Sequence, residues 1–552
     1  MLRREFLSAS SYLLGLAASG SGFAPPVQAM RNILDYGARP DGKTINTASI
    51  QRAIDDAFQA GGGTVYLPAG TFLSGRIDLK SRVGLYFGAG CTLLGSKSLS
   101  DYHGSPGSVD ASQRHLIYAR DAEEVTLAGA GRIDGQGASF WESSGRAPLP
   151  PDEQWAEVAS HAYKEKKSGR PSPMVRFANC RRVRVEGVRL ENSAGWTLHL
   201  LNCDDAQITG MAIKNPVYGP NTDGIDITGC QNVEVSGCTI ETGDDAICLK
   251  SENPLGPEPR LIKNVVVTNC SLTTCCNGFK LGTSSEGGFE NISFTNSVIS
   301  NGEVSFGERV ISGVALEVID GGWIDGVTVS GIKMQRARTP IFIRLGNRKR
   351  VHDYPQHGLR HVSIDNIQAS ETILASSITG LPGDEVRAVR LSNIRIENVL
   401  PSRPEWVGRA VPEKESAYPE ARMFGMLPAS GLYARHAREL ELDHLEFKAS
   451  PREQRPTLLF NDVDGARITS LASTPVSGSM PIVDLSNARN VSISGCVAPS
   501  GTNTFVAVDG SESANITISN NDLRSARRPC ATAGDVPPQA VTVTVTGTPR
   551  AD

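Results

Sequence analysis

Short runs in which apolar and polar residues alternate recur along the chain from residue 115 onward. In each run Val or Ile alternates with polar residues, Gly or Asn follows, and a second short apolar run comes next. The first apolar residues of three successive runs, Val183, Ile208 and Val233, lie 25 residues apart. Alternation with a period of two predicts β-strands, and a repeat in the twenties predicts coils that stack around one shared core.

The later runs repeat with similar spacing. Ile468, Val491 and Ile516 begin runs that are 23 and 25 residues apart, and the step of 32 residues from Val233 to Val265 requires only a loop insertion. The chain lacks the Leu/Asn consensus of leucine-rich repeats, and it lacks the regular hairpin turns of propeller blades. We therefore predict an all-β fold, a single right-handed parallel β-helix (solenoid).

A cap with one helix is predicted ahead of the solenoid. The apolar residues of segment 47–58 follow a helical period: Ile50, Ala53, Ile54, Ala57 and Phe58. A helix with this apolar face would cover the open core of the first coil. We expect the cap and first coils in residues 30–114, the central coils with the functional site in 115–400, and C-terminal coils in 401–552.

Residues 1–29 have the features of an export signal. The segment Arg3-Arg4-Glu5-Phe6-Leu7 is a twin-arginine pattern, an apolar stretch runs from Tyr12 to Ala24, and Val27-Gln28-Ala29 is similar to a cleavage site. The apolar stretch is too short to span a bilayer. We expect export through the twin-arginine machinery, no membrane span, and a mature protein in the periplasm or outside the cell.

Charge and cysteine usage narrow the function. The formal net charge is −4, with no basic excess, so we expect no nucleic-acid partner. Of the 11 cysteines, Cys180, Cys203 and Cys230 share one slot of the repeat, and Cys238, Cys270 and Cys496 share another. This recurrence predicts rows of small buried side chains and not a disulfide framework. No Cys/His cluster has zinc spacing, and we expect no metal and no cofactor.

Two acidic motifs carry the candidate chemistry. The segments Asn221-Thr-Asp-Gly-Ile-Asp-Ile and Gly243-Asp-Asp-Ala-Ile-Cys-Leu-Lys250 overlay without gaps at an offset of 22 residues, so that Asp223 matches Asp245. Stacked one coil apart, with Asp244 beside them, these carboxylates repel, and one should keep its proton near neutral pH. An acid and a base are what glycoside hydrolysis requires. The alternative is that they are turn residues capping backbone N–H groups.

The cap and the two acidic motifs resemble glycoside hydrolase family 28, the polygalacturonases and rhamnogalacturonan-degrading hydrolases of the pectin lyase-like β-helix superfamily. The resemblance covers residues 31–370. It implies an enzyme that hydrolyses pectic polysaccharide with inversion, with Asp244 as the general acid and Asp223 and Asp245 as the carboxylates that activate water.

Two other family motifs are altered. Asn277 stands where the family has the His of Gly-His-Gly, and Ala315-Leu316-Glu317 stands where it has Arg-Ile-Lys. Those cations hold the galacturonate carboxylate in the family, so the changes favour a rhamnogalacturonan-type substrate. Trp196 is a candidate sugar platform or a core residue, and Arg348 is a further candidate cation. The substrate-binding candidates are Asn221, Lys250, Asn277, Lys280, Glu317, Arg344, Trp196 and His199.

Three insertions interrupt the repeat, and two other functions remain possible for the acidic motifs. Segments 136–173, 252–260 and 401–430 interrupt the repeat, and the first includes a charged, helix-prone run. Insertions beside a groove can wall one end, which favours exo-action on terminal sugars. One rival is a polysaccharide lyase with Ca²⁺ held by Asp223, Asp244 and Asp245. The other is a non-catalytic β-helix that binds glycans.

Overall fold

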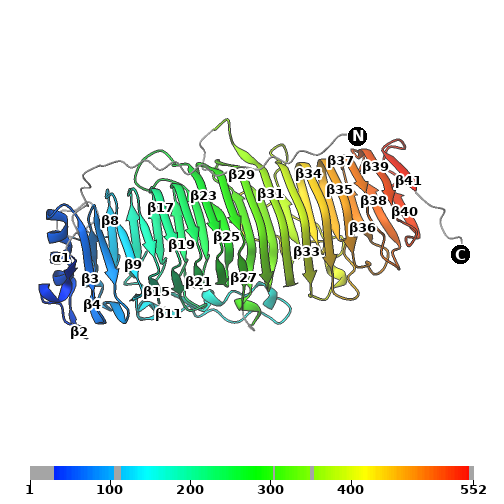
Figure 1. Cartoon of the computed structure of the whole chain (residues 1–552). Helices are drawn as coiled ribbons and strands as arrows, with labels where there is room; N and C mark the ends of the chain where they lie inside the picture. Colours follow the sequence, from blue (N-terminus) through cyan, green and yellow to red (C-terminus); the bar gives the residue numbers. More distant parts are fainter. Residues whose placement is uncertain (1–29, 105–112, 302–304, 349–353, 546–552) are drawn as a thin grey trace, which may run out of the picture.

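The protein is a long stack of coils in which parallel strands lie side by side. A computed structural model describes residues 30–104, 113–301, 305–348 and 354–545, and the signal predicted for residues 1–29 lies outside these ranges. Within them, 39 strands join one sheet, because the longer strands turn the corners between faces. Figure 1 shows the stack running from helix α1 at one end to β41 at the other. The fold is the predicted right-handed parallel β-helix.

Three ladders of parallel strands make the faces of the central coils. The first ladder contains β8 (Ile117–Arg120), β13 (Val175–Ala178), β16 (Leu198–Leu201), β19 (Ile225–Thr228), β22 (Ile247–Ser251), β25 (Asn277–Ser285), β28 (Val310–Val318), β30 (Ala337–Leu345), β32 (Ser376–Thr379) and the start of β34 (Leu432–Lys448). The second contains β9 (Thr126–Gly129), β14 (Arg184–Glu186), β17 (Asp204–Thr209), β20 (Gln231–Ser236), β23 (Ile262–Thr268), β26 (Gly288–Thr295), β29 (Trp323–Gln335), β31 (Gly358–Thr372) and β33 (Val386–Asn398). The third contains β10 (Arg132–Asp134), β15 (Arg189–Glu191), β18 (Ala212–Lys214), β21 (Thr239–Thr242), β24 (Ser271–Thr274) and β27 (Val298–Ser300).

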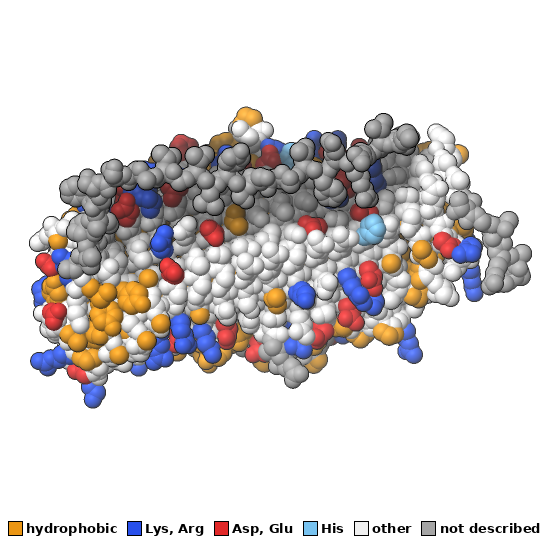
Figure 2. All heavy atoms as spheres, viewed as in Figure 1, with side chains coloured by type: hydrophobic (Ala, Val, Ile, Leu, Met, Phe, Trp, Pro, Cys, Tyr) orange, Lys and Arg blue, Asp and Glu red, His pale blue; other side chains and the backbone are white. Residues whose placement is uncertain are grey.

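The ends continue these ladders. The N-terminal strands are β1 (Arg31–Asn32), β2 (Asp41–Ile45), β3 (Gly63–Leu67), β4 (Gly70–Ser74), β5 (Ile77–Leu79), β6 (Val83–Phe87) and β7 (Cys91–Gly95). The C-terminal strands are β35 (Leu458–Ser473), β36 (Pro481–Ser486), β37 (Arg489–Ser494), β38 (Thr504–Asp509), β39 (Ala514–Asn521), β40 (Arg528–Thr532) and β41 (Val541–Val545). Figure 2 shows one face of the stack, with hydrophobic side chains gathered over the N-terminal coils. No helix of the described ranges is long and apolar enough to cross a membrane.

The alternating residues point into the core as predicted, but the predicted register is wrong by two residues at several coils. Ile208 pairs with Val185 and with Val235, not with Val183 and Val233. Ile468 likewise pairs with Ile493. A slip of two residues keeps every apolar side chain on the inner face, so the hydrophobic pattern alone cannot detect it.

The predicted cap helix is α1 (Thr47–Gln59), which packs against the first strands. Four of its predicted apolar residues are buried. Phe58 is the exception: its ring is 40% exposed, and Lys80 lies over it at 5.3 Å from the ring centroid. The prediction for Phe58 is wrong because this residue lies at the margin of the apolar face, whereas its neighbour Ala57 is fully buried.

Cysteines and asparagines occupy fixed slots in the coils. All 11 cysteines are free thiols, and all but Cys530 are buried. Asn232, Asn264 and Asn291 take positive φ at equivalent turns, where Asn tolerates the left-handed conformation better than most residues. Their side chains bond to one another, with Asn291 Nδ2 donating to Asn264 Oδ1 at 2.8 Å. The recurrent Asn of the sequence repeat is therefore a turn residue.

Two of the predicted insertions meet on the outer side of the first ladder. Segment 136–173 forms short 3-10 helices and an antiparallel ribbon of β11 (Trp141–Ser143) and β12 (Tyr163–Glu165), not the helix that its charged run suggested. A side cluster, defined here by its buried apolar residues, joins both insertions to the sheet. Its members are Val158, Cys275, Cys276, Ile311, Ala315, Phe342, Ala375, Ala421, Met423, Phe424, Leu427, Ala429 and Tyr433.

Candidate active site

Three carboxylates meet where β19 and β22 begin. Ile225 pairs with Ile247 in the parallel ladder, which confirms the offset of 22 residues between the two motifs. One oxygen from each of Asp223, Asp244 and Asp245 lies within 4.8 Å of the others. Asp223 is 4% exposed and Asp245 is 5% exposed, whereas Asp244 is half-buried. The acidic motifs thus form one cluster on the outer face of the first ladder.

Backbone and hydroxyl contacts fix the turn that carries Asp244 and Asp245. Thr242 Oγ1 donates to the Asp244 carbonyl at 2.6 Å, and Thr274 Oγ1 donates to the same oxygen at 2.5 Å. The Gly243 N–H donates to Thr222 Oγ1 at 3.0 Å, which joins this turn to the previous one. The carboxylates are held by a turn whose polar groups are already paired.

The environment separates the pKa values of the three carboxyl groups. Burial, and then the charge of Asp245, raises the pKa of Asp244 to about 6. Burial, and then the charge of Asp244, raises the pKa of Asp223 well above its usual range. Burial alone would raise the pKa of Asp245 too, but Lys280, Lys250 and the Asn277 amide hold it below its usual value. Asp245 therefore ionises at a lower pH than its two neighbours, which is the separation that acid–base chemistry uses.

Lys280 and Asn277, both on β25, make the contacts to Asp245. Lys280 Nζ lies 3.2 Å from Asp245 Oδ2 and 3.9 Å from Glu317 Oε2. Asn277 Nδ2 donates to Asp245 Oδ1 at 2.6 Å. Burial raises the pKa of Glu317 to about 8 despite the nearby lysine. Because Lys280 is closer to Asp245 than to Glu317, its charge stabilises the ionised form of Asp245 more strongly. Tyr418 from the second insertion also reaches this lysine, with its hydroxyl 3.3 Å from Nζ.

A second chain of contacts runs along the same ladder from β22 through β19 to β16. Lys250 forms an ion pair with Asp226, whose side chain is fully buried. The same ammonium group lies 4.3 Å from the centroid of Trp196. Trp196 contacts His199 edge-on, and His199 Nε2 lies 3.0 Å from Thr228 Oγ1. Burial lowers the pKa of His199 well below its usual value, so this ring is neutral.

Asn221 Nδ2 donates to Asp244 Oδ2 at 3.2 Å, so ten of the eleven residues predicted for the site lie in or against these two groups, and Arg344 is the exception. Its side chain is fully buried, and its guanidinium donates to the carbonyls of Gly380 at 3.1 Å and Glu413 at 2.9 Å. The prediction that Arg344 binds the substrate is wrong, because the 401–430 insertion covers this side chain. Arg348 is also engaged, in an ion pair with Asp320 at 2.7 Å.

Three residues that contact the predicted site residues were not predicted from the sequence: Asp226, Arg170 and Tyr418. Asp226 alternates with the inward Ile225 and Ile227, so the period of two could have placed it on the outer face beside Lys250. Arg170 donates to Asn221 Oδ1 at 3.3 Å. Arg170 and Tyr418 come from the two insertions, which have no repeat from which their positions could be predicted.

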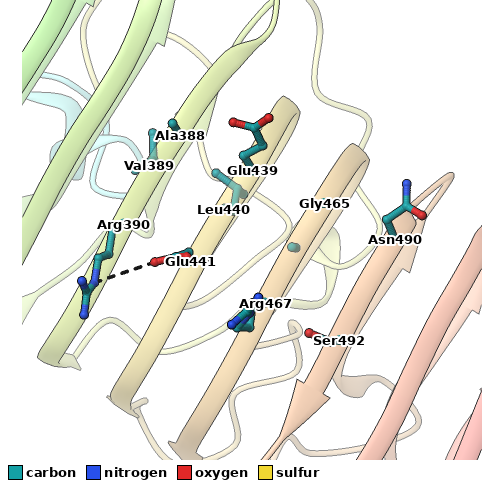
Figure 3. A pocket seen from close by; sticks show the side chains of 11 residues that line it. Ala388, Val389, Arg390, Glu439, Leu440, Glu441, Gly465, Arg467, Asn490 and Ser492 are labelled. Carbon is teal, nitrogen blue, oxygen red and sulfur yellow. Dashed lines mark ion pairs between the residues drawn. The ribbon is translucent and has the colours of Figure 1, made fainter.

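A shallow groove elsewhere does not contain this chemistry. It crosses β33, β34, β35 and β37 on the second ladder, and Figure 3 shows its lining side chains on the outer surface. Arg390 and Glu441 pair there at 4.0 Å. None of the three clustered carboxylates lines it, so the candidate active site remains the cluster on the first ladder.

The family model of glycosyl hydrolases family 28 matches residues 61–402, which include the whole cluster. The chain belongs to this family. This family 28 glycoside hydrolase is 26% identical over 389 residues to "Probable polygalacturonase" of Vitis vinifera, a match that covers 66% of this chain and 74% of that one. It is 28% identical to "Exo-poly-alpha-D-galacturonosidase" of Dickeya chrysanthemi, over 39% of this chain and 41% of that one.

Among solved structures, the hydrolase is similar to an exopolygalacturonase from Thermotoga maritima. The TM-score is 0.54 at 25% sequence identity, and the match covers 67% of this chain and 87% of that chain. The family 28 exopolygalacturonase of Yersinia enterocolitica shares the fold, with a TM-score of 0.53 at 18% identity over 84% of this chain and 78% of that chain.

Proposed function

We propose that this family 28 hydrolase cleaves glycosidic bonds of pectic poly- or oligosaccharides. In this proposal Asp244 protonates the glycosidic oxygen as that bond breaks. Asp245 accepts a proton from the water that attacks the anomeric carbon, and Asp223 helps to orient this water. The observation that carries the proposal is the close cluster of three carboxylates with separated pKa values, in which Asp244 is the least buried. Inversion of the anomeric centre is proposed from family membership.

Exo-action is proposed from the position of the two insertions. Arg422 donates to the carbonyl of Ala156, and the buried Arg338 donates to the carbonyl of Trp155 at 2.9 Å. With the side cluster, these contacts cover the outer face of β28 and β30, directly after the strand that carries Lys280. A wall at this point supports binding of a chain end. The Dickeya protein is named an exo-poly-alpha-D-galacturonosidase and the Thermotoga protein an exopolygalacturonase, and both names support exo-action.

A rhamnogalacturonan-type substrate is proposed over plain polygalacturonan. Lys250 pairs with Asp226, Lys280 pairs with Asp245, and Arg344 is committed to carbonyls. The cations expected to bind a uronate are therefore engaged with the protein itself. Buried Glu317 adds an acid beside Lys280. These contacts favour a sugar recognised through hydroxyl groups at this position.

We also propose export to the periplasm or the extracellular space through the twin-arginine route. The support is the pattern in residues 1–29. Detection of the mature protein outside the cytoplasm, and its retention inside after Arg3→Lys with Arg4→Lys, would test this proposal.

The main experiment compares the wild type with Asp244→Asn on a panel of pectic oligosaccharides. We expect wild type to release single sugars of inverted configuration, followed by ¹H NMR, and the variant to lose roughly 10²–10⁴-fold in kcat while it still binds. A ladder of mid-length products would contradict exo-action. Products that absorb in the ultraviolet, together with inhibition by a chelator, would indicate a lyase. Binding without turnover by wild type would indicate a glycan-binding protein.

A further inference from the structure

A pair of exposed tyrosine rings lies beside the candidate active site. Tyr163 on β12 and Tyr218 in the loop before Asn221 have ring centroids 5.4 Å apart and are tilted by 42°. Their exposed fractions are 40% and 44%. We propose that this pair is a sugar-stacking platform that binds a pyranose unit of the substrate next to the cleavage site. The inference rests on the proposed function and extends it by a binding subsite.

The loop that carries Tyr218 lies against the turn that carries Asp244. A side chain added at Gly243 would meet the Gly219 carbonyl oxygen at 2.3 Å, so these two backbones touch. Asn221 Nδ2 donates to Asp244 Oδ2 at 3.2 Å. Three residues of chain span at most about 11 Å, so Tyr218 cannot lie far from Asn221. The backbone that carries Tyr218 therefore lies beside the turn that carries Asp244.

The contacts of the ribbon keep the two rings in a fixed relation to the site. Trp141 Nε1 on β11 donates to the Ala194 carbonyl at 2.7 Å. Arg170 forms an ion pair with Glu165 of β12 at 3.2 Å and donates to the Pro220 carbonyl at 2.7 Å. This arginine thus links the ribbon to the loop of Tyr218. A rigid aromatic surface binds a ligand with a smaller loss of side-chain entropy than a mobile one.

The ligand class follows from the surface. Two exposed rings beside hydrogen-bonding groups offer an apolar face with polar margins, which matches a pyranose with its C–H face and its hydroxyl groups. The occupant is the oligosaccharide whose glycosidic bond lies at Asp244, because the platform adjoins that residue. Val217, next to Tyr218, packs against the side cluster that covers β28 and β30, so the platform adjoins the wall.

The chain contains a matched control pair in the cap. Tyr66 and Tyr86 have ring centroids 6.2 Å apart, are tilted by 39°, and lie on β3 and β6. Tyr86 is 43% exposed, close to the value for Tyr218. This pair has a similar geometry, and the described part of the chain places no cluster of three carboxylates beside it. Its removal tests the loss of an exposed tyrosine without the loss of the proposed subsite.

The experiment measures kcat and KM of Tyr163→Ala, Tyr218→Ala, Tyr218→Phe and Tyr86→Ala on pectic oligosaccharides of increasing length. We expect the two Ala variants of the platform to raise KM by roughly three- to tenfold on every oligosaccharide that spans the cleavage site, with a smaller change in kcat. Tyr218→Phe should retain most of the affinity, because it keeps the ring. Tyr86→Ala should match the wild type.

Direct binding separates this inference from the proposed function. In an Asp244→Asn background, calorimetric titration with a long oligosaccharide should show the same loss of affinity on Tyr218→Ala. An unchanged KM and an unchanged affinity in both platform variants, with an active wild type, would overturn the platform and leave the hydrolase intact. Absence of hydrolysis by wild type would instead contradict the proposed function. An equal loss with Tyr86→Ala would mean that the effect is structural and would also overturn the platform.

Discussion

Replacing Lys280 by Met tests how the candidate active site keeps one carboxylate ionised. Lys280 Nζ is 3.2 Å from Asp245 Oδ2, and both side chains are almost fully buried. At an effective dielectric constant of about 20, two unit charges at that 3.2 Å separation attract by about 5 kcal/mol. Met has a similar length and no charge, so the substitution removes this attraction while it retains most of the packing.

The sign of the expected pH effect follows from the direction of the shift. Lys280 helps to hold the pKa of Asp245 below its usual value, against burial. Without the ammonium group of Lys280, only Lys250 and Asn277 counteract the effect of burial on Asp245. The pKa of Asp245 therefore rises. If Asp245 is the base, the acidic limb of the profile of kcat against pH moves upward by more than one pH unit, since 1.4 kcal/mol corresponds to about one unit. Activity should be lost first at low pH.

The assay is the full pH profile of kcat and KM for wild type, Lys280→Met and the control Lys263→Met. Lys263 pairs with Glu290 at 3.1 Å but is 43% exposed and lies on another ladder, so its variant should leave the profile unchanged. We also expect Lys280→Met to lower stability by about 3–5 kcal/mol, because buried carboxylates lose their cation. An unmoved acidic limb with a higher KM for acidic sugars only would refute the reasoning and restore Lys280 as a substrate ligand.

Two further predictions concern buried charges near the site. Arg344→Lys should lower the thermal midpoint, because the lysine cannot reach both the Gly380 and the Glu413 carbonyls. The expected loss in free energy of unfolding is about 1–3 kcal/mol. A change in substrate affinity without a change in stability would contradict the structural role of Arg344. Glu317, with a pKa of about 8 against an ordinary value of 4.5, keeps a proton in the folded state that the unfolded chain releases, so wild-type stability should fall between these pH values by up to about 1.4 kcal/mol per unit. Glu317→Gln should remove this dependence, and parallel thermal midpoints of the two proteins at pH 5 and pH 8 would contradict the shifted pKa.

The periodic part of the chain was predictable from its sequence, and the insertions were not. The overlay of Asp223 on Asp245 succeeded because two gap-free motifs share a register, which the pairing of Ile225 with Ile247 confirms. The register between Val183 and Ile208 failed because a two-residue slip conserves the inward pattern. The burial of Arg344 was not predictable, because it depends on the path of the 401–430 insertion, and no periodicity describes that path.

The contact between Arg422 and Ala156 has a consequence for the order of assembly. These residues are 266 positions apart, whereas each coil bonds mainly to the coils before and after it. During synthesis the coils around Asp223 can stack as soon as they emerge, but the wall over β28 and β30 cannot form until the chain has passed residue 430. Shortened chains that stop near residue 400 would therefore carry the acidic residues without this wall, and the proposed chain-end selectivity would be a property that only the longer polypeptide acquires.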